Sequence, residues 1–404
     1  MSTERVPMRW PAEWTDPARL ELLEGTPINC LVGDEPPPFP LGDIEFLTLD
    51  GENPPDGVTL REGIWPTVQA GEGGGQDDAE AGPTGAPWVD SNAWVVRLAQ
   101  AKEPGKKVWL DYAPPSGSEV VPLNVLPRPV AEAEAYGAHW IITLTDHFRQ
   151  GIENRDADAL ETWKKMMAVL EFSAEHAEWR EWEPVAALAV VSNFEFENEF
   201  LAGEFLNLAP RNHLAHRIVL AGEAANASYS DQKAILYIDV NPPEGELWNT
   251  FRGFAESGGL VILPMLPGDL GEPTGEQKGY DIFTVGKGRV ATPREEWYDP
   301  WVLAEEVQLL LSHREDVVRI WNGGSMNSHY VASPDKSKGV VHLVNYGGGA
   351  NPLEAVTLGF AEEYQSARVF TIDSVKTVKP VQARLGTEVP IPPFTLYAAV
   401  ELGG

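Results

Sequence analysis

The sequence predicts an α/β protein of three units, and three patterns support this prediction. Over residues 25–180, short apolar runs typical of strands alternate with stretches of helical periodicity. From residue 183 to 322 the order strand-helix-strand repeats. Residues 323–404 contain only short β-rich runs separated by Gly, Pro and Asp turns. We therefore expect domains at 1–182, 183–322 and 323–404.

The first unit is expected to be a reduced or irregular (β/α) barrel-like domain. Its clearest elements are strands at Pro27–Val32, Lys107–Tyr112 and His139–Thr145 and helices at Ala93–Lys102 and Asp156–Trp179. A complete eight-fold barrel usually needs roughly 200 residues or more, so this stretch is too short for one. The acidic, Gly-rich segment Gly71–Gly85 suits a linker, a mobile lid or an ordered active-site loop.

The second unit reads as a small doubly wound sheet and the third as an antiparallel β-sandwich. Buried strands are expected in the second unit at Val185–Ser192, Ala234–Asp239 and Gly259–Pro264, with a helix at Gly245–Ser257. In the third unit the strands include Gly339–Asn345 and Thr395–Glu401, and helical periodicity is absent.

Composition excludes several classes of function. The net charge of −31 repels DNA, RNA and anionic lipid, so we expect no nucleic-acid partner and no membrane partner. The single cysteine, Cys30, lies in an apolar run, which predicts a buried thiol and excludes an intramolecular disulfide. No run approaches the ~20 apolar residues of a membrane span. The N-terminal residues lack a signal-peptide core, so we expect a cytoplasmic protein.

The segment Ala86–Asn92, APWVDSN, is the strongest candidate for a ligand site. An aromatic residue, a carboxylate and an amide stand where an extended segment gives way to a helix. Strand C-terminal ends carry the chemistry in barrel-like α/β folds. Aromatic rings stack on the apolar face of a sugar, and Asp and Asn bind hydroxyls. We therefore expect a carbohydrate ligand contacted by Trp88, Asn92 and Trp94.

Carboxylates at strand ends are the candidates for catalysis, because glycoside hydrolysis usually needs two carboxyl groups. The catalytic candidates are Asp90, Asp111 and Asp146, and further substrate-binding candidates are Asp50, Glu52 and His147. Asp90 and Asp111 are preferred because their strands are consecutive and neighbouring parallel strands lie ~4.8 Å apart. Strand-end Asp residues also cap helices or hold turns, and that alternative stays open.

No metal or cofactor is expected. His213 and His216 have a spacing that suits metal binding on a helix, but no third ligand is evident nearby. The sequence GEGGG is not followed by the Lys-Ser/Thr of a phosphate-binding loop.

Five segments together resemble clan-A type β-galactosidases and similar bacterial glycoside-hydrolase-like proteins. They are PWVDSNAW, KVWLDYAPP, FAESGGLVILP, VVHLVNY and FTLYAAVEL. The resemblance implies a barrel-type domain, a flavodoxin-like domain of the glutamine-amidotransferase kind and a C-terminal β-sandwich. It also implies action on O-glycosyl bonds and a homo-oligomer.

The sequence departs from this pattern at two points. A glutaminase needs a nucleophilic cysteine, and the second unit has none. The acid/base Glu that such glycosidases place after Asn is missing from the first unit, because the dipeptide occurs only at Asn198-Glu199. Two functions therefore stay open: a glycoside hydrolase, or a catalytically degenerate saccharide-binding or scaffold protein with no turnover.

Overall fold

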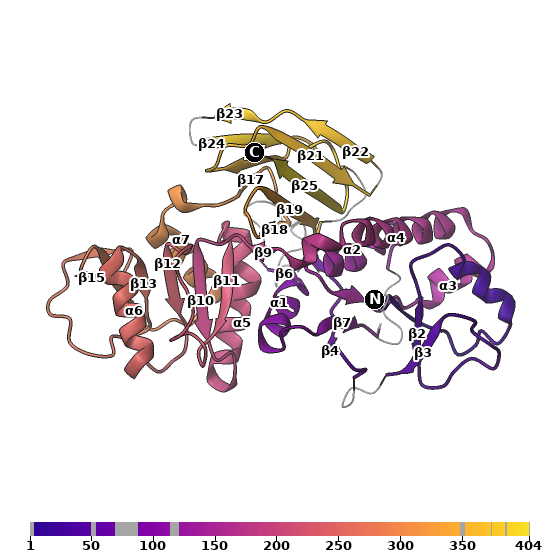
Figure 1. The fold of residues 1–404 in the computed structure, drawn as a ribbon, viewed down its shortest axis with the longest axis horizontal. Helices are drawn as coiled ribbons and strands as arrows, with labels where there is room; N and C mark the ends of the chain where they lie inside the picture. Colours follow the sequence, from indigo (N-terminus) through magenta and orange to yellow (C-terminus); the bar gives the residue numbers. More distant parts are fainter. Residues whose placement is uncertain are drawn as a thin grey trace, which may run out of the picture.

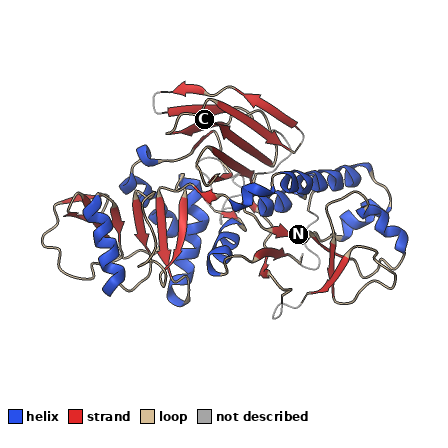
Figure 2. Cartoon of the chain, in the orientation of Figure 1, coloured by secondary structure: helices blue, strands red, loops and turns tan. Residues whose placement is uncertain are grey.

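The computed structural model describes residues 4–49, 54–68, 88–113, 121–347, 352–372, 374–383 and 386–403. The protein is a mixed α/β molecule with both parallel and antiparallel sheets (Figures 1 and 2), as the sequence predicts. We call residues 4–182 the N-terminal region, 185–318 the central region, and 319–403 with 183–184 the C-terminal region. No helix within the described ranges is both long and apolar enough to cross a membrane.

Six parallel strands form the centre of the N-terminal region. They are β1 (Pro7–Arg9), β2 (Cys30–Gly33), β3 (Glu45–Thr48), β4 (Val58–Glu62), β7 (Lys107–Asp111) and β8 (His139–Trp140). One sheet has the order β1-β2-β3 and another the order β4-β7-β8. A parallel bridge between Met8 and Ile142 joins β1 to the end of β8, and the Arg9 amide donates to the Ile142 carbonyl at 2.8 Å. The row therefore runs β3-β2-β1-β8-β7-β4.

The row curls, because strands at its opposite ends share one apolar core. This core contains Cys30, Val32, Val58, Trp109 and Ile141, with Leu47, Leu49 and Leu60 packed against it. Leu47 comes from β3 and Leu60 from β4, although no ladder joins these two strands. Cys30 is fully buried, as its apolar run predicts, and burial raises the pKa of its thiol to about 12.

Helices and short turns surround these strands. They are α1 (Ala93–Lys102), α2 (Pro127–Ala135), α3 (Asp146–Glu153) and α4 (Ala157–Glu175), with 3₁₀ turns η1 (Pro17–Leu23), η2 (Leu123–Val125) and η3 (Ala177–Glu181). Two further strands, β5 (Thr67–Val68) and β6 (Val89–Asp90), pair with each other in antiparallel fashion. The bounds predicted for α1 are confirmed. Helix α4 begins where Asp156 accepts hydrogen bonds from the amides of Asp158 and Ala159.

The central region is a seven-stranded sheet with helices on both faces. Its strands are β10 (Leu188–Ser192), β11 (His216–Leu220), β12 (Ala234–Tyr237), β13 (Leu260–Ile262), β14 (Gly275–Gln277), β15 (Tyr280–Val285) and β16 (Gly288–Pro293). Its helices and turns are η4 (Phe196–Asn198), α5 (Glu199–Leu208), η5 (Ala209–Asn212), α6 (Gly245–Ser257), α7 (Pro300–Leu311) and η6 (His313–Glu315). Leu188 and Val190 pack with α5 and α7, whereas Ala189 and Val191 pack with α6.

The C-terminal region consists of two antiparallel sheets that share one core. Its strands are β9 (Glu183–Pro184), β17 (Arg319–Trp321), β18 (Met326–Ala332), β19 (Lys338–Asn345), β20 (Thr357–Phe360), β21 (Ser366–Thr371), β22 (Ser374–Val378), β23 (Val381–Ala383), β24 (Gly386–Pro390) and β25 (Tyr397–Gly403). The sheet orders are β17-β20-β24-β23 and β22-β21-β25-β19-β18-β9. Leu358 from the first sheet and Val341 from the second belong to the same buried cluster.

Several elements differ from the sequence prediction. The strand expected at His139–Thr145 ends at Trp140, and Thr145 instead caps α3, its side chain accepting from the Phe148 amide. Helix α5 begins only at Glu199, because Phe194 and Phe196 have positive φ angles of 54° and interrupt helical backbone before it. Strand β4 was not predicted at all.

Candidate functional site

Two carboxylates stand in register at the carboxyl ends of β4 and β7. Glu62 is the ladder partner of Asp111. Side chains two residues apart on a strand point to the same face, and Leu60 and Trp109 point into the shared core. Glu62 and Asp111 therefore continue the inward face of the curled row, at the end of the strands where barrel-type enzymes carry their chemistry.

Arg9, the last residue of β1, completes this group from another strand of the curled row. It is the ladder partner of inward-facing Val32, so it also points inward. Its Nη2 donates to both carboxylate oxygens of Asp111, at 2.6 and 2.7 Å. The two side chains are 30% and 26% exposed, so the ion pair is reachable from solvent. We call the group of Arg9, Glu62 and Asp111 the mouth.

Three aromatic rings lie at the same strand ends, on the outer face. Tyr112 contacts Trp140 with ring centroids 5.5 Å apart, and Trp65 lies 6.0 Å from Tyr112 and 6.5 Å from Trp140. Gly63 makes room for them, since a Cβ there would lie 2.9 Å from the Trp140 ring. Trp65 and Tyr112 are only half-buried, and burial raises the pKa of the Tyr112 hydroxyl.

Chemically, the mouth offers hydrogen-bond acceptors and a fixed cation beside exposed ring surface. The ion pair with Arg9 holds the Asp111 carboxylate in place and leaves lone pairs for hydroxyl donors. Glu62, the last residue of β4, is exposed to solvent. This set suits a polyhydroxylated ligand.

The structure places Asn92 inside the protein. Its side chain accepts from the Ile64 amide at 2.8 Å and donates to the Ile64 carbonyl and to Glu132. Glu132 also accepts from the hydroxyls of Ser91 and Tyr346. Asn92 is 1% exposed, and its contacts tie the segment that follows β4 to the start of α1 and to α2. Burial raises the pKa of the Glu132 carboxyl above its ordinary value.

Trp88 and Trp94 pack against the central region. Trp88 Nε1 donates to Glu204 at 3.1 Å, and the Trp94 ring lies against Gly203 of α5. Both rings belong to the apolar cluster around α5 and α7. These contacts join two regions of the chain, and a substrate-binding role for these two residues stays a prediction.

Asp90 and Asp146 do not share the strand ends of Asp111. Strand β6, which carries Asp90, pairs with β5, whereas β7 pairs with β4 and β8. The expected adjacency of the Asp90 and Asp111 strands is therefore absent. Asp146 begins α3, is 86% exposed and forms an i,i+3 ion pair with Arg149, and His147 beside it is exposed.

Asp50, Glu52 and the segment Gly71–Gly85 lie outside the described residues. Among the residues that are described, no group of three or more His, Cys, Asp or Glu side chains is placed to hold a metal ion. His216 Nε2 instead contacts Arg97 at 2.9 Å, and His213 accepts from the Ile320 amide.

Sequence reasoning missed Glu62 and Arg9. A signal for Glu62 exists, because VTLRE has strand-like residues between the turn Asp56-Gly57 and Gly63. No local signal marks Arg9, since its partner Asp111 is 102 residues away.

A buried ion-pair network occupies the opposite, amino ends of the strands. Glu134 bonds His139 at 2.6 Å and Arg180 at 2.9 Å, while Lys107 and His139 contact Glu4 at 3.1 and 3.3 Å. Burial disfavours the charges of Glu134 and His139, but the attraction between opposite charges prevails. It lowers the pKa of Glu134 and raises the pKa of His139 to about 9.

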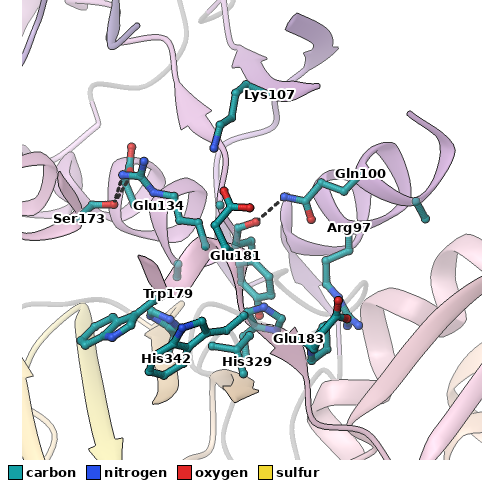
Figure 3. Close-up of a pocket in the computed structure, with 18 of the residues that line it drawn as sticks. Arg97, Gln100, Lys107, Glu134, Ser173, Trp179, Glu181, Glu183, His329 and His342 are labelled. Carbon is teal, nitrogen blue, oxygen red and sulfur yellow. Dashed lines mark hydrogen bonds and ion pairs between the residues drawn. The ribbon is translucent and has the colours of Figure 1, made fainter. Parts of the chain in front are cut away.

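A cavity of about 670 Å³ adjoins this network (Figure 3). Its walls come from α1, α2 and α4, from β11 and from the strands β18, β19 and β25, so all three regions contribute. We call it the junction cavity.

Comparison with known proteins supports the predicted family resemblance at the level of fold. The α-L-fucosidase isoenzyme 2 from Paenibacillus thiaminolyticus superposes with a TM-score of 0.52 and 12% identity, covering 77% of this chain and 62% of the fucosidase chain. A β-galactosidase from Bacillus circulans sp. alkalophilus gives a TM-score of 0.50 and 10% identity, covering 77% and 58%. The chain thus spans less than two thirds of either enzyme.

Sequence comparison adds nothing to this likeness, because neither a family model nor a curated protein matches the chain. The likeness therefore concerns the fold alone, which resembles that of these glycoside hydrolases, as the sequence resemblance predicts.

Proposed function

We propose that this chain is a glycoside-hydrolase-like protein that binds a saccharide at the mouth. Arg9, Glu62 and Asp111 would contact sugar hydroxyls, and the exposed parts of Trp65 and Tyr112 would meet the apolar face of a ring. The supporting observation is the in-register pair Glu62–Asp111 at the carboxyl ends of parallel strands, in a fold shared with glycosidases.

We also infer the finer layout that the sequence indicates. The N-terminal region would be a reduced barrel-like domain of six strands, the central region an amidotransferase-like domain and the C-terminal region a β-sandwich. The helices on both faces of the central sheet and the shared core of the two C-terminal sheets support this layout. A homo-oligomer stays a prediction, and a monomer by light scattering would contradict it.

Hydrolysis is a second candidate function, favoured by the spacing of Glu62 and Asp111. Retaining glycosidases hold two carboxyl groups ~5–5.5 Å apart, which neighbouring strands achieve. Asp111, held in place by its ion pair with Arg9, suits the role of nucleophile or base. Glu62 would then protonate the leaving oxygen. The assignment of Asp90 and Asp146 as catalytic residues remains the competing hypothesis.

The test measures binding and turnover on the same variants. Calorimetry with galactose, glucose, lactose and cellobiose, and release of nitrophenol from aryl glycosides, would be recorded for the parent, Glu62→Gln and Asp146→Asn. We expect Glu62→Gln to weaken binding about tenfold or more. Asp146→Asn changes the net charge equally and should leave binding unchanged.

The outcomes separate the candidates. Binding without nitrophenol release would support saccharide binding without turnover. Nitrophenol release that is lost in Glu62→Gln and kept in Asp146→Asn would support hydrolysis at the mouth. Loss of binding in Asp146→Asn and not in Glu62→Gln, or no binding of any probe by the parent, would overturn the mouth as the site.

A further inference from the structure

The junction cavity has the size and position of a ligand site that the mouth does not include. Its volume of about 670 Å³ lies within the usual ~300–1,000 Å³ of small-molecule sites, which favour domain interfaces. It adjoins the start of β7 at Lys107 and the turn before β8 at Gly137. It therefore lies at the amino ends of the strands, opposite the mouth.

Arg97 brings a positive charge to this cavity without a counter-charge. Its guanidinium contacts the Nε2 atom and the backbone carbonyl of His216. No carboxylate of the described residues lies within ion-pair distance of it, whereas Arg180 and Lys107 on the same cavity are paired with acids. Burial lowers the pKa of Arg97 to about 10, which leaves it charged at neutral pH. An uncompensated, partly desolvated guanidinium favours an anion.

Two imidazoles beside Arg97 have nitrogens open to a ligand. Neither ring nitrogen of His329 has a hydrogen-bond partner among the described residues, and its ring stacks on Tyr136 at 4.7 Å. His342 uses Nδ1 to contact the Tyr397 hydroxyl at 2.7 Å, which leaves Nε2. Burial and then Arg97 hold the pKa of His329 well below its ordinary value, and burial lowers that of His342 to about 3. Both rings are thus neutral partners for hydroxyls.

The wall around these groups is aromatic. The ring centroids of Trp179 and His342 lie 5.8 Å apart, and Trp182 is half-buried beside Trp179. Tyr136 and Tyr397 add their rings to the same wall. Figure 3 shows Arg97, Trp179, His329 and His342 arranged around the pocket. Ring surface of this kind packs against the apolar face of a sugar or a similar cyclic polyol.

The surrounding charges favour a single negative charge on the ligand. Glu181 and Glu183 lie exposed at the rim, and Glu223 lines the cavity too. Arg217, a second arginine on the cavity without a carboxylate partner among the described residues, donates to the Ser228 carbonyl at 3.0 Å. A phosphate monoester carries ≈ −1.5 to −2 at pH 7 and would be repelled by the three carboxylates at this rim. A carboxylate matches the single positive charge that Arg97 presents between the two imidazoles and the aromatic wall.

We propose that the junction cavity binds a carboxylate-bearing sugar of the uronic-acid class. Its carboxylate pairs with Arg97, its hydroxyls bond His329 and His342, and its ring lies against the aromatic wall. The site is separate from the mouth and does not depend on the function proposed there.

The test titrates D-galacturonate and D-glucuronate into the full-length protein by calorimetry, with galactose and galactose 6-phosphate as comparison probes. Parent protein should bind at least one uronate about tenfold or more tightly than the two comparison probes. Arg97→Gln should remove that preference. His329→Phe keeps a ring on Tyr136 and should weaken uronate binding several-fold.

Controls separate this site from the mouth and from loss of folding. Glu62→Gln should leave uronate binding unchanged, and thermal melting would verify that each variant folds. If Arg97→Gln does not fold, His329→Phe alone carries the test. Binding of both uronates no tighter than that of galactose, loss of uronate binding in Glu62→Gln, full binding by His329→Phe, or no uronate binding by the parent would overturn the proposal.

Discussion

The two ends of the six parallel strands use charged residues in different ways. At the mouth, Glu62 is exposed and the Arg9–Asp111 pair is about a quarter to a third exposed. At the amino ends, Glu134 and His139 are each 4% exposed and locked to partners from distant parts of the chain. The accessible charged side chains at the mouth suit ligand contact, whereas the enclosed charged side chains at the amino ends stabilise the fold.

Removing an enclosed carboxylate should give the largest loss of stability. In Glu134→Ala, His139 and Arg180 lose the acid between them. We expect the free energy of unfolding to fall by about 3–5 kcal/mol, because these two buried charges lose their buried partner and keep only Glu4, whose side chain is 32% exposed. Urea unfolding measures this, with Asp146→Ala, a solvent-exposed change, expected to stay within about 1 kcal/mol. Equal losses of the free energy of unfolding in the two variants would contradict the difference between enclosed and exposed carboxylates.

The same network predicts a loss of stability with rising pH. The folded pKa of His139 is about 9, above its ordinary value of 6.5. Between these values the folded state binds more protons than the unfolded state, so this contribution is complete below pH 6.5 and disappears as pH rises through 9. Urea unfolding at pH 6, 7.5 and 9 should show the decline in the parent, and His139→Gln should flatten it. A decline of the same size in His139→Gln would argue against this origin.

Tyr346→Phe tests the buried contact between the N-terminal and C-terminal regions. Its hydroxyl donates to Glu132 at 2.6 Å and lies 3.1 Å from the Ser91 hydroxyl. Loss of this partner should reduce the free energy of unfolding by about 1–3 kcal/mol. Tyr298→Phe, a 79% exposed tyrosine, is the matched control. No measurable difference between them would mean that the Glu132 network adds little to stability.

Mouth variants should show the smallest effect on stability. Glu62→Gln alters an exposed side chain, so the free energy of unfolding should change by less than about 0.5 kcal/mol. Thermal melting checks this. A large loss of stability would make Glu62 a structural residue and remove the contrast between the two strand ends.

Local patterns were enough to predict much of the fold. Helices α1 and α6 have the predicted bounds, and β7 differs by one residue, because strong periodicity and Gly or Pro boundaries mark them. Strand β4 was missed although VTLRE is strand-like and lies between a turn and a glycine, because a signal of only five residues is short.

The candidate site was harder to predict because it depends on strand pairing. Asp111 was recognised as a strand-end carboxylate, but its neighbours Glu62 and Arg9 are set by ladders between distant segments. Asn92 illustrates the reverse case. Its residue type suggests ligand contact, yet its amide is fully engaged by Ile64 and Glu132 inside the protein.

The central claim is that the carboxyl ends of the strands hold the saccharide site. Calorimetric titration of neutral saccharides into the parent, Glu62→Gln and Arg97→Gln proteins tests it most directly. We predict that galactose, glucose or one of their disaccharides binds the parent and Arg97→Gln alike and binds Glu62→Gln about tenfold or more weakly. Binding that is lost in Arg97→Gln and kept in Glu62→Gln would contradict the claim.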